Sequence, residues 1–468
     1  MKAFDFVVIG GGSAGYAGAR TAVGLGLSTA VVEGADQLGG LCILRGCMPS
    51  KALLESASRY RAIRQAGDFG LSAGAHAFDA AKVIARKRRL IADFAGYRSG
   101  QLEDGRFALI RGSAELTGPG TLVVHRPDGG KEEVTARALL IATGSAQSVP
   151  PVPGLAEAQP VTSDDMLDSE TIPASLVVLG GGPVALEMAS YASAFGSRVT
   201  VIQRSPQILR GCDRDAAEAL AEGLRADGIG IFAGTQILRI SREGPLRRIV
   251  FLHEGREVEV SGHAVLNALG RHAVIPPGLE VALAAGKIAA SLTQQTSCPH
   301  IFAAGDVCSP LEVVHVAIQQ GEVAARNAAR ILRGTGEALE EMDYRLKVFA
   351  VFTEPGFACA GDSEEELRSK AIPFLCAKYP FDDHGKSLVM GETHGFVKIL
   401  AHERTGEILG ASVVGPEAAE LIHEIVVAMR FRATAADLAA TPHYHPTLSE
   451  IWTYPAEEIA EAVAARGA

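Results

Sequence analysis

The sequence predicts an α/β fold in which one β-α-β unit occurs twice, and three observations support this prediction. Residues 4–35 align with residues 174–205 without a gap. Each copy begins with a short apolar run, at 6–9 and at 176–179, of the kind that forms a buried strand. In both copies a glycine-rich turn, a helix-like segment and a second β-rich run follow. The 468 residues are enough for about three domains.

The glycine-rich turns indicate that each copy binds a dinucleotide. The first copy has the pattern G-x-G-x-x-G and the second has G-x-G-x-x-A. Glycines at these positions allow a tight turn and let the backbone approach a pyrophosphate at the helix N-terminus. Each copy is therefore predicted to be a Rossmann-like dinucleotide-binding domain. The predicted contacts are Gly10, Gly12, Ser13 and Gly15 in the first copy, and Gly180, Gly182 and Ala185 in the second.

The two copies differ at the position that faces the ribose. Glu33 ends the first copy and is suited to accept hydrogen bonds from ribose hydroxyls. The second copy has Gln203, followed by Arg204 and Arg210. A carboxylate would repel a 2′-phosphate, whereas a neutral amide and a cation would not, so these residues favour NADP(H). The alternative, that both arginines are ordinary surface residues, stays open.

Two cysteines five positions apart, Cys42 and Cys47, form a candidate redox group. A zinc site needs two more ligands at matched spacing, and none is nearby, so we predict no metal. In a regular helix the two Cα atoms would lie about 8.7 Å apart, beyond the limit of about 6.8 Å for a disulfide. A disulfide therefore requires an irregular turn, which Gly46 could supply. A helix over 52–63 would place Cys47 near its N-terminus, where a thiolate is stabilised. Two buried thiols remain the alternative.

A second candidate group lies near the C-terminus, where His443, His445 and Glu450 fall within eight residues. Thiol–disulfide exchange needs a group that takes and returns a proton near neutral pH, and imidazole does this. A glutamate directed at the imidazole would fix its tautomer and raise its basicity. Purely structural histidines remain the alternative.

The composition excludes several functional classes. A formal charge of -10 does not favour nucleic-acid binding, and we expect the one basic run, 86–89, to be a solvated helix face. Glycines and Glu187 interrupt the longest apolar stretch, 176–195, so no membrane span is predicted. The first twelve residues do not resemble a signal peptide. Seven cysteines are too few for a disulfide scaffold, so we expect a cytoplasmic protein.

Four motifs in this order resemble the class I pyridine nucleotide–disulfide oxidoreductases over essentially the whole chain. The segment G-G-x-C-x3-G-C-x-P-S-K at 39–51 resembles the redox-active site of that family. The segment 140–145 resembles its ATG motif, and 296–306 resembles its second FAD fingerprint. The pattern H-x-H-P-T-x-x-E at 443–450 resembles its acid–base dyad. The stretches 390–393, 406–416 and 420–424 resemble the dimerisation domain of the dihydrolipoamide dehydrogenase branch of that family.

The resemblance implies an FAD domain split around an NAD(P) domain, followed by a C-terminal α+β dimerisation domain. The implied boundaries are 1–147 and 273–344 for FAD, 148–272 for NAD(P), and 345–468 for the interface of a homodimer. Cys42 and Cys47 would be the redox disulfide, His445 the acid–base group, Glu450 its orienting partner, and Lys51 and Glu187 an ion pair near the flavin. Further implied cofactor contacts are Gly40, Lys51, Thr143, Gly144, Gly270, Arg271, Gly305 and Asp306.

The substrate implied is a lipoyl-bearing protein or a small disulfide. An NAD-preferring member of the family is expected to have an acidic residue where this sequence has Gln203 and Arg204. Pro183 stands where the family usually has an apolar or aromatic residue over the nicotinamide pocket. An NADPH-dependent reductase of the glutathione reductase type, with Arg20 on the substrate side, is therefore the main alternative. A mercuric reductase-like enzyme and an FAD-bound redox sensor without turnover are the others.

Overall fold

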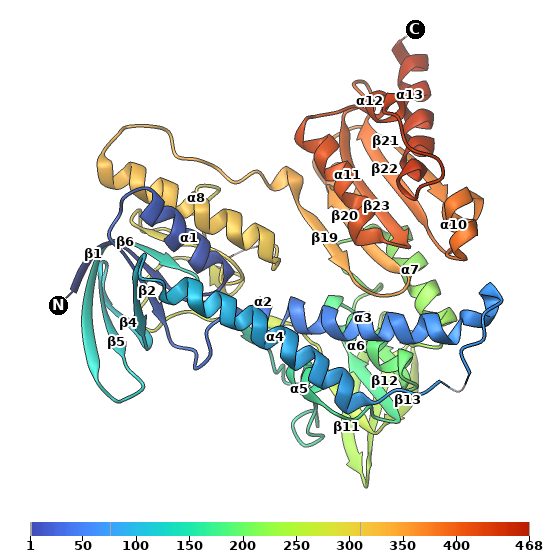
Figure 1. Ribbon diagram of the computed structural model, residues 1–468, viewed down its shortest axis with the longest axis horizontal. Coiled ribbons are helices and arrows are strands. Elements are labelled where there is room, and N and C mark those ends of the chain that lie inside the picture. Colours follow the sequence, from blue (N-terminus) through green and yellow to red (C-terminus); the bar gives the residue numbers. More distant parts are fainter. Residues whose placement is uncertain (1, 75, 309, 468) are drawn as a thin grey trace. The chain divides into compact units, whose positions relative to one another are not determined.

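The computed structural model describes residues 2–74, 76–308 and 310–467, which form two compact units (Figure 1). Unit 1 comprises the chain up to Pro49, together with Ala85–Ser148 and Gly270–Asp343. Unit 2 comprises Ser50–Ile84, Val149–Leu269 and the chain from Tyr344 onward. Each unit is therefore assembled from segments that are far apart in the sequence.

Unit 1 is built on a seven-stranded sheet in the order β3-β2-β1-β6-β5-β4, with β18 also paired to β6. The strands β1, β2, β3, β6 and β18 are parallel, and β4 and β5 complete the sheet as antiparallel strands. The apolar run at the end of β1 is buried on both faces, as in parallel sheets. The strands are β1 (Lys2–Ile9), β2 (Thr29–Glu33), β3 (Ala108–Arg111), β4 (Ser113–Gly118), β5 (Thr121–His125), β6 (Lys131–Ile141) and β18 (Ile301–Ala303).

Two helices of unit 1, α1 (Ser13–Gly24) and α8 (Val314–Arg333), pack side by side against this sheet (Figure 1). Glycines permit their close approach, because a Cβ on Gly321 would lie 2.1 Å from the Ala14 carbonyl oxygen. A Cβ on Gly18 would lie 2.5 Å from Leu140 Cδ2 in β6. The small residues of α1 therefore fix where the helix begins relative to the sheet.

Unit 2 contains a parallel sheet, an antiparallel three-stranded sheet and an antiparallel five-stranded sheet. The parallel order is β10 (Gly230–Phe232), β9 (Arg198–Ile202), β8 (Ser175–Leu179) and β14 (Ala264–Asn267). The three-stranded order is β11 (Gln236–Glu243), β12 (Leu246–His253) and β13 (Arg256–Gly262). The five-stranded order is β19 (Val348–Val351), β20 (Gly356–Gly361), β23 (Ile408–Gly415), β22 (Phe396–His402) and β21 (Phe374–Pro380).

The helices of unit 2 cover these sheets. The helix α6 follows β8 and packs on β8 and β9, while α11 packs on β20 and β23 of the five-stranded sheet. Pro183 begins α6, where its missing N–H costs no helical hydrogen bond. The helices are α5 (Ser163–Asp168), α6 (Pro183–Ala194), α7 (Arg214–Ala226), α9 (Glu364–Ser369), α10 (Gly385–Met390), α11 (Ala418–Arg430), α12 (Ala435–Ala440) and α13 (Thr453–Gly467).

The structure confirms both predicted β-α-β units, since β1-α1-β2 and β8-α6-β9 occupy the two repeats. Each pair of strands is parallel, as the unit requires. The helix predicted over 52–63 is also present as part of α3 (Cys47–Arg64). The repeat in the sequence is therefore a repeat in the fold.

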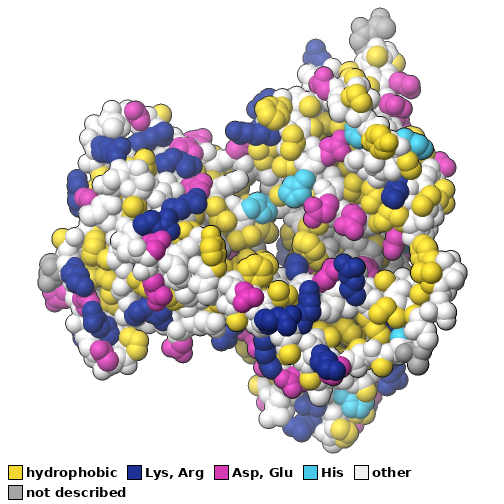
Figure 2. Space-filling model, in the orientation of Figure 1, with side chains coloured by type: hydrophobic (Ala, Val, Ile, Leu, Met, Phe, Trp, Pro, Cys, Tyr) yellow, Lys and Arg dark blue, Asp and Glu magenta, His cyan; other side chains and the backbone are white. Residues whose placement is uncertain are grey.

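The prediction of a fully solvated basic run on α4 (Ala80–Glu103) is wrong at one position. Arg86, Arg88 and Arg89 are exposed, but Lys87 is only 5% exposed. Lys87 lies three residues after the buried Ile84, on the same face of the helix. On the face that Figure 2 shows, Lys and Arg side chains are interspersed with Asp and Glu. Among the described residues, no helix is both long enough and apolar enough to span a membrane.

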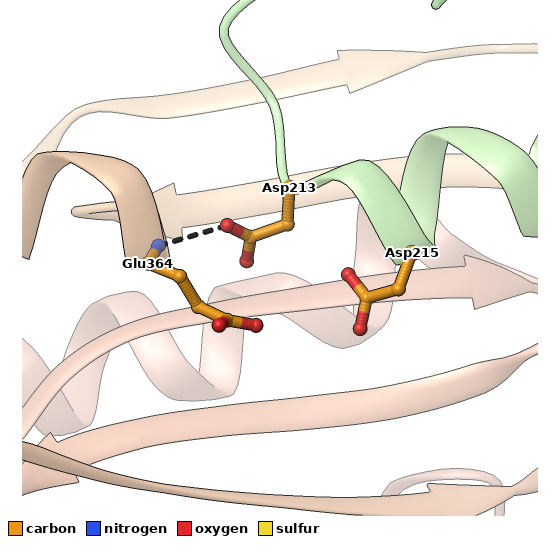
Figure 3. A group of neighbouring side chains, drawn as sticks. All are labelled: Asp213, Asp215 and Glu364. Atoms are coloured by element: carbon orange, nitrogen blue, oxygen red, sulfur yellow. Dashed lines mark hydrogen bonds between the residues drawn. The ribbon is translucent and has the colours of Figure 1, made fainter.

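A buried lysine links the start of α7 to the five-stranded sheet of unit 2. Lys398 of β22 is fully buried, and its Nζ lies 2.6 Å from Asp213 Oδ2, 2.7 Å from Asp215 Oδ1 and 3.0 Å from Glu364 Oε1. Figure 3 shows these carboxylates, and Asp213 also accepts the Glu364 backbone N–H at 2.8 Å. Three carboxylates this close resemble a set of metal ligands, but the Lys398 ammonium compensates their charge.

The charge state of this cluster follows from its hydrogen bonds. Burial alone would lower the pKa of Lys398, but the hydrogen bonds to Asp213 and Asp215 outweigh it and raise the pKa. Because Asp213 and Asp215 lie at the start of α7 and Lys398 lies in the five-stranded sheet, the cluster connects the two.

We expect Lys398→Met to lower the free energy of unfolding by about 3–5 kcal/mol, because three carboxylates would lose their buried counter-ion. Lys370→Met is the matched control, since Lys370 is 49% exposed where it pairs with Asp362, and exposed pairs contribute less than about 1 kcal/mol. Guanidinium unfolding of the purified protein measures both. Equal losses in the two variants would contradict a stabilising role for the cluster.

Candidate functional site

The two cysteines of the candidate redox group lie on two different helices, a short one and a long one. Cys42 belongs to α2 (Gly40–Leu44), and Cys47 is the first residue of α3. The helix breaks at Arg45 and Gly46, which is the irregular turn that a disulfide at this spacing requires. A Cβ on Gly46 would lie 3.2 Å from Cys42 Cα and 3.0 Å from the Leu41 carbonyl oxygen, so the tight turn favours glycine. Both cysteines are half-buried.

The first glycine-rich turn lies between β1 and α1 and is shaped by close backbone contacts. Gly10 has a φ of +103°, and a Cβ there would lie 2.4 Å from the Ala142 carbonyl oxygen. A Cβ on Gly15 would lie 1.8 Å from the Gly10 carbonyl oxygen. By contrast, the space beside Gly12 is open, and no side chain caps the first backbone N–H groups of α1. The turn thus presents free donors and room for a diphosphate, which fits the predicted FAD.

Glu33 and Gly40 lie beside the first glycine-rich turn and belong to the predicted FAD site in unit 1. Glu33 Oε2 accepts the Gly11 N–H at 2.7 Å, and Oε1 accepts the Ala35 N–H at 2.7 Å. These bonds hold the carboxylate beside the turn, and each oxygen has a further lone pair for a ribose hydroxyl. Gly40 has a φ of +72°, and a Cβ there would lie 2.7 Å from Gly12 Cα, so the start of α2 contacts the turn.

The other predicted FAD contacts come together through a chain of hydrogen bonds in unit 1. Arg271 donates from Nε to Ser145 Oγ at 2.8 Å and from Nη2 to the Ser145 carbonyl at 2.7 Å. Ser145 Oγ in turn donates to Asp306 Oδ2 at 2.7 Å. Ser145 pairs with Ala273 in the two-stranded sheet of β7 (Ser145–Gln147) and β15 (Arg271–Ala273). The ATG motif and the second fingerprint, 161 residues apart, are therefore one local structure.

Hydrogen bonds also fix the loops on either side of the Arg271–Ser145–Asp306 hydrogen-bond series. Thr143 Oγ1 donates to the Val274 carbonyl, and Gly144 has a φ of +71°. Gln320 of α8 is fully buried, and its Oε1 accepts the Gly305 N–H at 2.8 Å. Sequence reasoning did not identify Ser145 or Gln320 as site residues. No spacing signal points to Gln320, because only the packing of α8 brings it to Gly305.

In unit 2, Lys51 and Glu187 form the predicted ion pair. Lys51 Nζ lies 2.7 Å from Glu187 Oε1 and 2.8 Å from Oε2, and the Glu187 side chain is only 5% exposed. Phe352 joins the pair twice, since its backbone N–H donates to Glu187 Oε1 at 3.2 Å and its ring centre lies 4.5 Å from Lys51 Nζ. Sequence reasoning missed Phe352, which no motif marks.

The second glycine-rich turn, in unit 2, has the shape of the first. Gly180 has a φ of +117°, and a Cβ there would lie 2.3 Å from the Ala268 carbonyl oxygen. The space beside Gly182 is open, and Gly182 precedes α6 without a side-chain cap. Ala185 is buried at the position equivalent to Gly15. The turn fits the diphosphate of the predicted NAD(P).

The residues predicted to choose the coenzyme follow β9 directly. Gln203 Nε2 donates weakly to the Gln207 carbonyl at 3.4 Å. Arg204 and Arg210 are exposed, and within the described parts of the chain neither forms an ion pair with Asp or Glu. Gly270, with a φ of +106°, turns the chain immediately before Arg271. Two uncompensated cations therefore remain on the surface beside this strand.

The C-terminal histidines of unit 2 have separate carboxylate partners. His445 Nδ1 lies 3.1 Å from both Glu450 Oε1 and Oε2. The His445 side chain is 78% exposed, whereas that of Glu450 is 10% exposed. His443 contacts Glu424 of α11 through Nε2 instead. The predicted pairing of His445 with Glu450 is present, and it leaves Nε2 of His445 free to face solvent.

Comparisons with known proteins identify the family. Residues 4–321 match the family described as pyridine nucleotide-disulphide oxidoreductase, and residues 349–456 match the dimerisation domain of that family. The chain is 34% identical to a dihydrolipoyl dehydrogenase of Bacillus subtilis (strain 168), with 96% of each chain covered. It is also 34% identical to a dihydrolipoyl dehydrogenase of Thermus scotoductus, again with 96% of each covered.

A solved structure shows the same similarity. The Cu(II) complex of RclA, an HOCl-induced flavoprotein disulfide reductase from Escherichia coli, gives a TM-score of 0.83 at 26% identity. The match covers 98% of this chain and 100% of that chain. The chain therefore belongs to the pyridine nucleotide-disulphide oxidoreductase family. It is a flavin-dependent oxidoreductase that acts on a sulfur group with FAD and NAD(P)(H), and its dimerisation domain supports a homodimer.

We expect Gly15→Ala to yield protein without bound FAD, because the new methyl group would overlap the Gly10 carbonyl and displace the turn. Such overpacking costs about 1–3 kcal/mol. Gly24→Ala, at the open end of the same helix, is the matched control and should bind FAD normally. The ratio of flavin to protein absorbance after purification measures the effect. A Gly15→Ala protein with a full complement of FAD would refute this account of the turn.

Proposed function

We propose that this member of the pyridine nucleotide-disulphide oxidoreductase family is a dihydrolipoamide dehydrogenase-like enzyme that oxidises a dithiol. The observation that carries the proposal is the His445–Glu450 pair, in which both carboxylate oxygens lie 3.1 Å from Nδ1 while the imidazole is exposed. Such a pair can take a proton from an incoming thiol. The names of the relatives from Bacillus subtilis and Thermus scotoductus point to the same substrate class.

In the proposed reaction, Cys42 and Cys47 begin as a disulfide. His445 accepts the proton of one substrate thiol, and the thiolate attacks Cys42 Sγ. The bond between the cysteines breaks, so that Cys47 leaves as a thiolate and the substrate is joined to Cys42. The second substrate thiol then attacks the substrate sulfur of this mixed disulfide, and its proton passes to the departing Cys42 Sγ, so that Cys42 leaves as a thiol while His445 keeps the first proton. The substrate becomes a disulfide, and the cysteine pair is reduced by two electrons.

The position of Cys47 suits the thiolate that this reaction leaves. Cys47 is the first residue of α3, where the helix dipole favours a negative charge. FAD, when bound, supplies two-electron transfer between the reduced cysteines and the nicotinamide. We infer that Gly10, Gly12, Ser13, Gly15 and Glu33 hold its diphosphate and ribose.

We infer that Lys51 and Glu187 act as a fixed ion pair beside the flavin. Because Glu187 is buried and bonded to both Lys51 and the Phe352 backbone, the ammonium has little freedom to move. A positioned cation stabilises negative charge that develops on a nearby group. Asp306, held by Ser145 and Arg271, is inferred to contact the ribityl region.

We infer NADP(H) as the preferred coenzyme, bound by Gly180, Gly182 and Ala185. Gln203 carries no negative charge, and Arg204 and Arg210 are exposed cations that can pair with a 2′-phosphate. An acidic residue in place of Gln203 would favour NAD instead.

The proposal also includes the assembly and location of the enzyme. We infer domains at 1–147, 148–272, 273–344 and 345–468, and a homodimer in which His445 of the partner subunit serves Cys42. Large exposed apolar side chains in the last domain, which a second copy would cover, are Leu388, Val389, Val427, Phe431 and Tyr444. The substrate would be a lipoyl-bearing protein or small disulfide in the cytoplasm.

The proposal is tested by following oxidation of dihydrolipoamide by the purified, yellow protein with NAD+ and NADP+ in parallel. We expect turnover with both coenzymes and a higher kcat/KM with NADP+. Reduction of glutathione disulfide by NADPH is measured beside it. If dihydrolipoamide is not oxidised but glutathione disulfide is reduced fast, glutathione disulfide replaces dihydrolipoamide as the proposed substrate.

We expect Cys42→Ser and Cys47→Ser each to reduce dithiol turnover to background while FAD stays bound, because neither variant can form the disulfide. Cys376→Ser is the control, since Cys376 is an exposed residue of β21 outside the proposed machinery. Steady-state rates and the flavin absorbance spectrum are measured for all three. Substantial turnover in either of the first two variants would exclude the proposed disulfide.

A further inference from the structure

Glu450 has a second histidine neighbour that no motif marks. His384 lies immediately before α10 and is completely buried. Its Nε2 is 3.5 Å from Glu450 Oε1, and this buried nitrogen has no hydrogen-bond partner among the described residues. Glu450 therefore lies between an exposed histidine, His445, and a buried one.

The other nitrogen of His384 has a partner of its own. His384 Nδ1 lies 2.8 Å from Oγ of Ser387, which is also fully buried. If Nε2 carried a lone pair, it would face the carboxylate oxygen of Glu450, and the two lone pairs would repel. With hydrogen on Nε2, the imidazole instead donates toward Glu450 and accepts the Ser387 hydroxyl at Nδ1. The surroundings thus select the Nε2–H tautomer.

The surroundings also keep His384 uncharged. Burial lowers the pKa of His384, although Glu450 acts in the opposite direction. The other titratable groups around it are His445, Tyr454 of α13, whose ring is 6.4 Å away, and Asp383, which accepts the Tyr379 hydroxyl. The pKa of Tyr379 is raised to about 12, so this phenol is neutral as well.

We propose that His384 is a positioning residue for the acid–base pair: its Nε2–H donates to Glu450 and fixes the carboxylate whose oxygens hold His445. This inference depends on the proposed function, in which His445 takes the thiol proton. The 3.5 Å contact is longer than an ordinary hydrogen bond, and the proposal requires it to shorten when substrate binds, as hydrogen bonds at catalytic sites often do. The Ser387–His384–Glu450–His445 series thus runs from the protein interior to solvent.

The proposal predicts a defined change in pH dependence. Without the donor from His384, the ionised Glu450 is less stabilised, so the Glu450–His445 pair retains its proton to higher pH. Because the reaction needs an unprotonated His445, the acidic limb of the rate profile should move upward. Hydrogen bonds to charged groups are worth roughly a tenfold change in equilibrium, so the shift should be about one pH unit.

The test uses the FAD-loaded enzyme and measures dihydrolipoamide oxidation from about pH 5 to 9, across the range in which histidine titrates. We expect His384→Leu to move the acidic limb upward by about one pH unit. His384→Gln, which retains an N–H donor of similar reach, should restore the wild-type profile. Ser387→Ala, a smaller change, should shift the limb in the same direction if the leucine variant does not fold.

His263→Leu is the matched control, because His263 Nδ1 also lies 2.8 Å from a serine, Ser175, but His263 lies between β13 and β14 and has no proposed catalytic or binding role. Its profile should be unchanged. His445→Ala, measured in parallel, should slow turnover by about 10²–10⁴-fold. If His445→Ala is fully active, the proposed function fails. If His445→Ala is slow but His384→Leu and Ser387→Ala keep the wild-type profile, only the role of His384 is refuted.

Discussion

Close contact between backbone segments at the first glycine-rich turn is the constraint on which the rest of unit 1 depends. The turn can form only if residues 10 and 15 lack a Cβ, because the carbonyls of Ala142 and Gly10 occupy that space. No side chain of the N-cap residue covers the first N–H groups of α1, so this helix terminus carries partial positive charge. Gly40 extends the constraint, since its contact with Gly12 places α2, and with it Cys42, next to the turn. Sterics that build the fold therefore also create the anion site.

Unit 2 depends instead on charge compensation. Lys398 and Glu187 are both buried ions, and each is held by partners from separate segments of the chain. Buried charges are tolerated only when they are paired and hydrogen-bonded, so each pair specifies how its segments pack. The two pairs differ in exposure. Lys398 is inaccessible and connects α7 to the five-stranded sheet, whereas Lys51 keeps 30% of its side chain exposed.

The acid–base pair combines both kinds of environment within a few residues. Glu450 is buried by the fold of the five-stranded sheet and its helices, while His445 extends into solvent. The Glu450 carboxylate is therefore surrounded by buried residues while it contacts the exposed imidazole of His445. The fully buried His384 and Ser387 extend the same series inward, so packing inside unit 2 surrounds the carboxylate that contacts the exposed imidazole.

The sequence by itself determined both β-α-β units and the contact between His445 and Glu450, because these depend on local periodicity or on residues a few positions apart. The disulfide between Cys42 and Cys47 stays a prediction. The sequence could also mark the need for a break near Gly46, since helix geometry sets the distance between Cys42 and Cys47. Tertiary structure alone decided the partners that lie far away in the chain: Ser145 for Asp306, Phe352 for Lys51, and His384 for Glu450. It also buried Lys87 within a run that looked solvated. Which face of a helix or which end of a strand meets a distant segment depends on packing, and no local pattern encodes it.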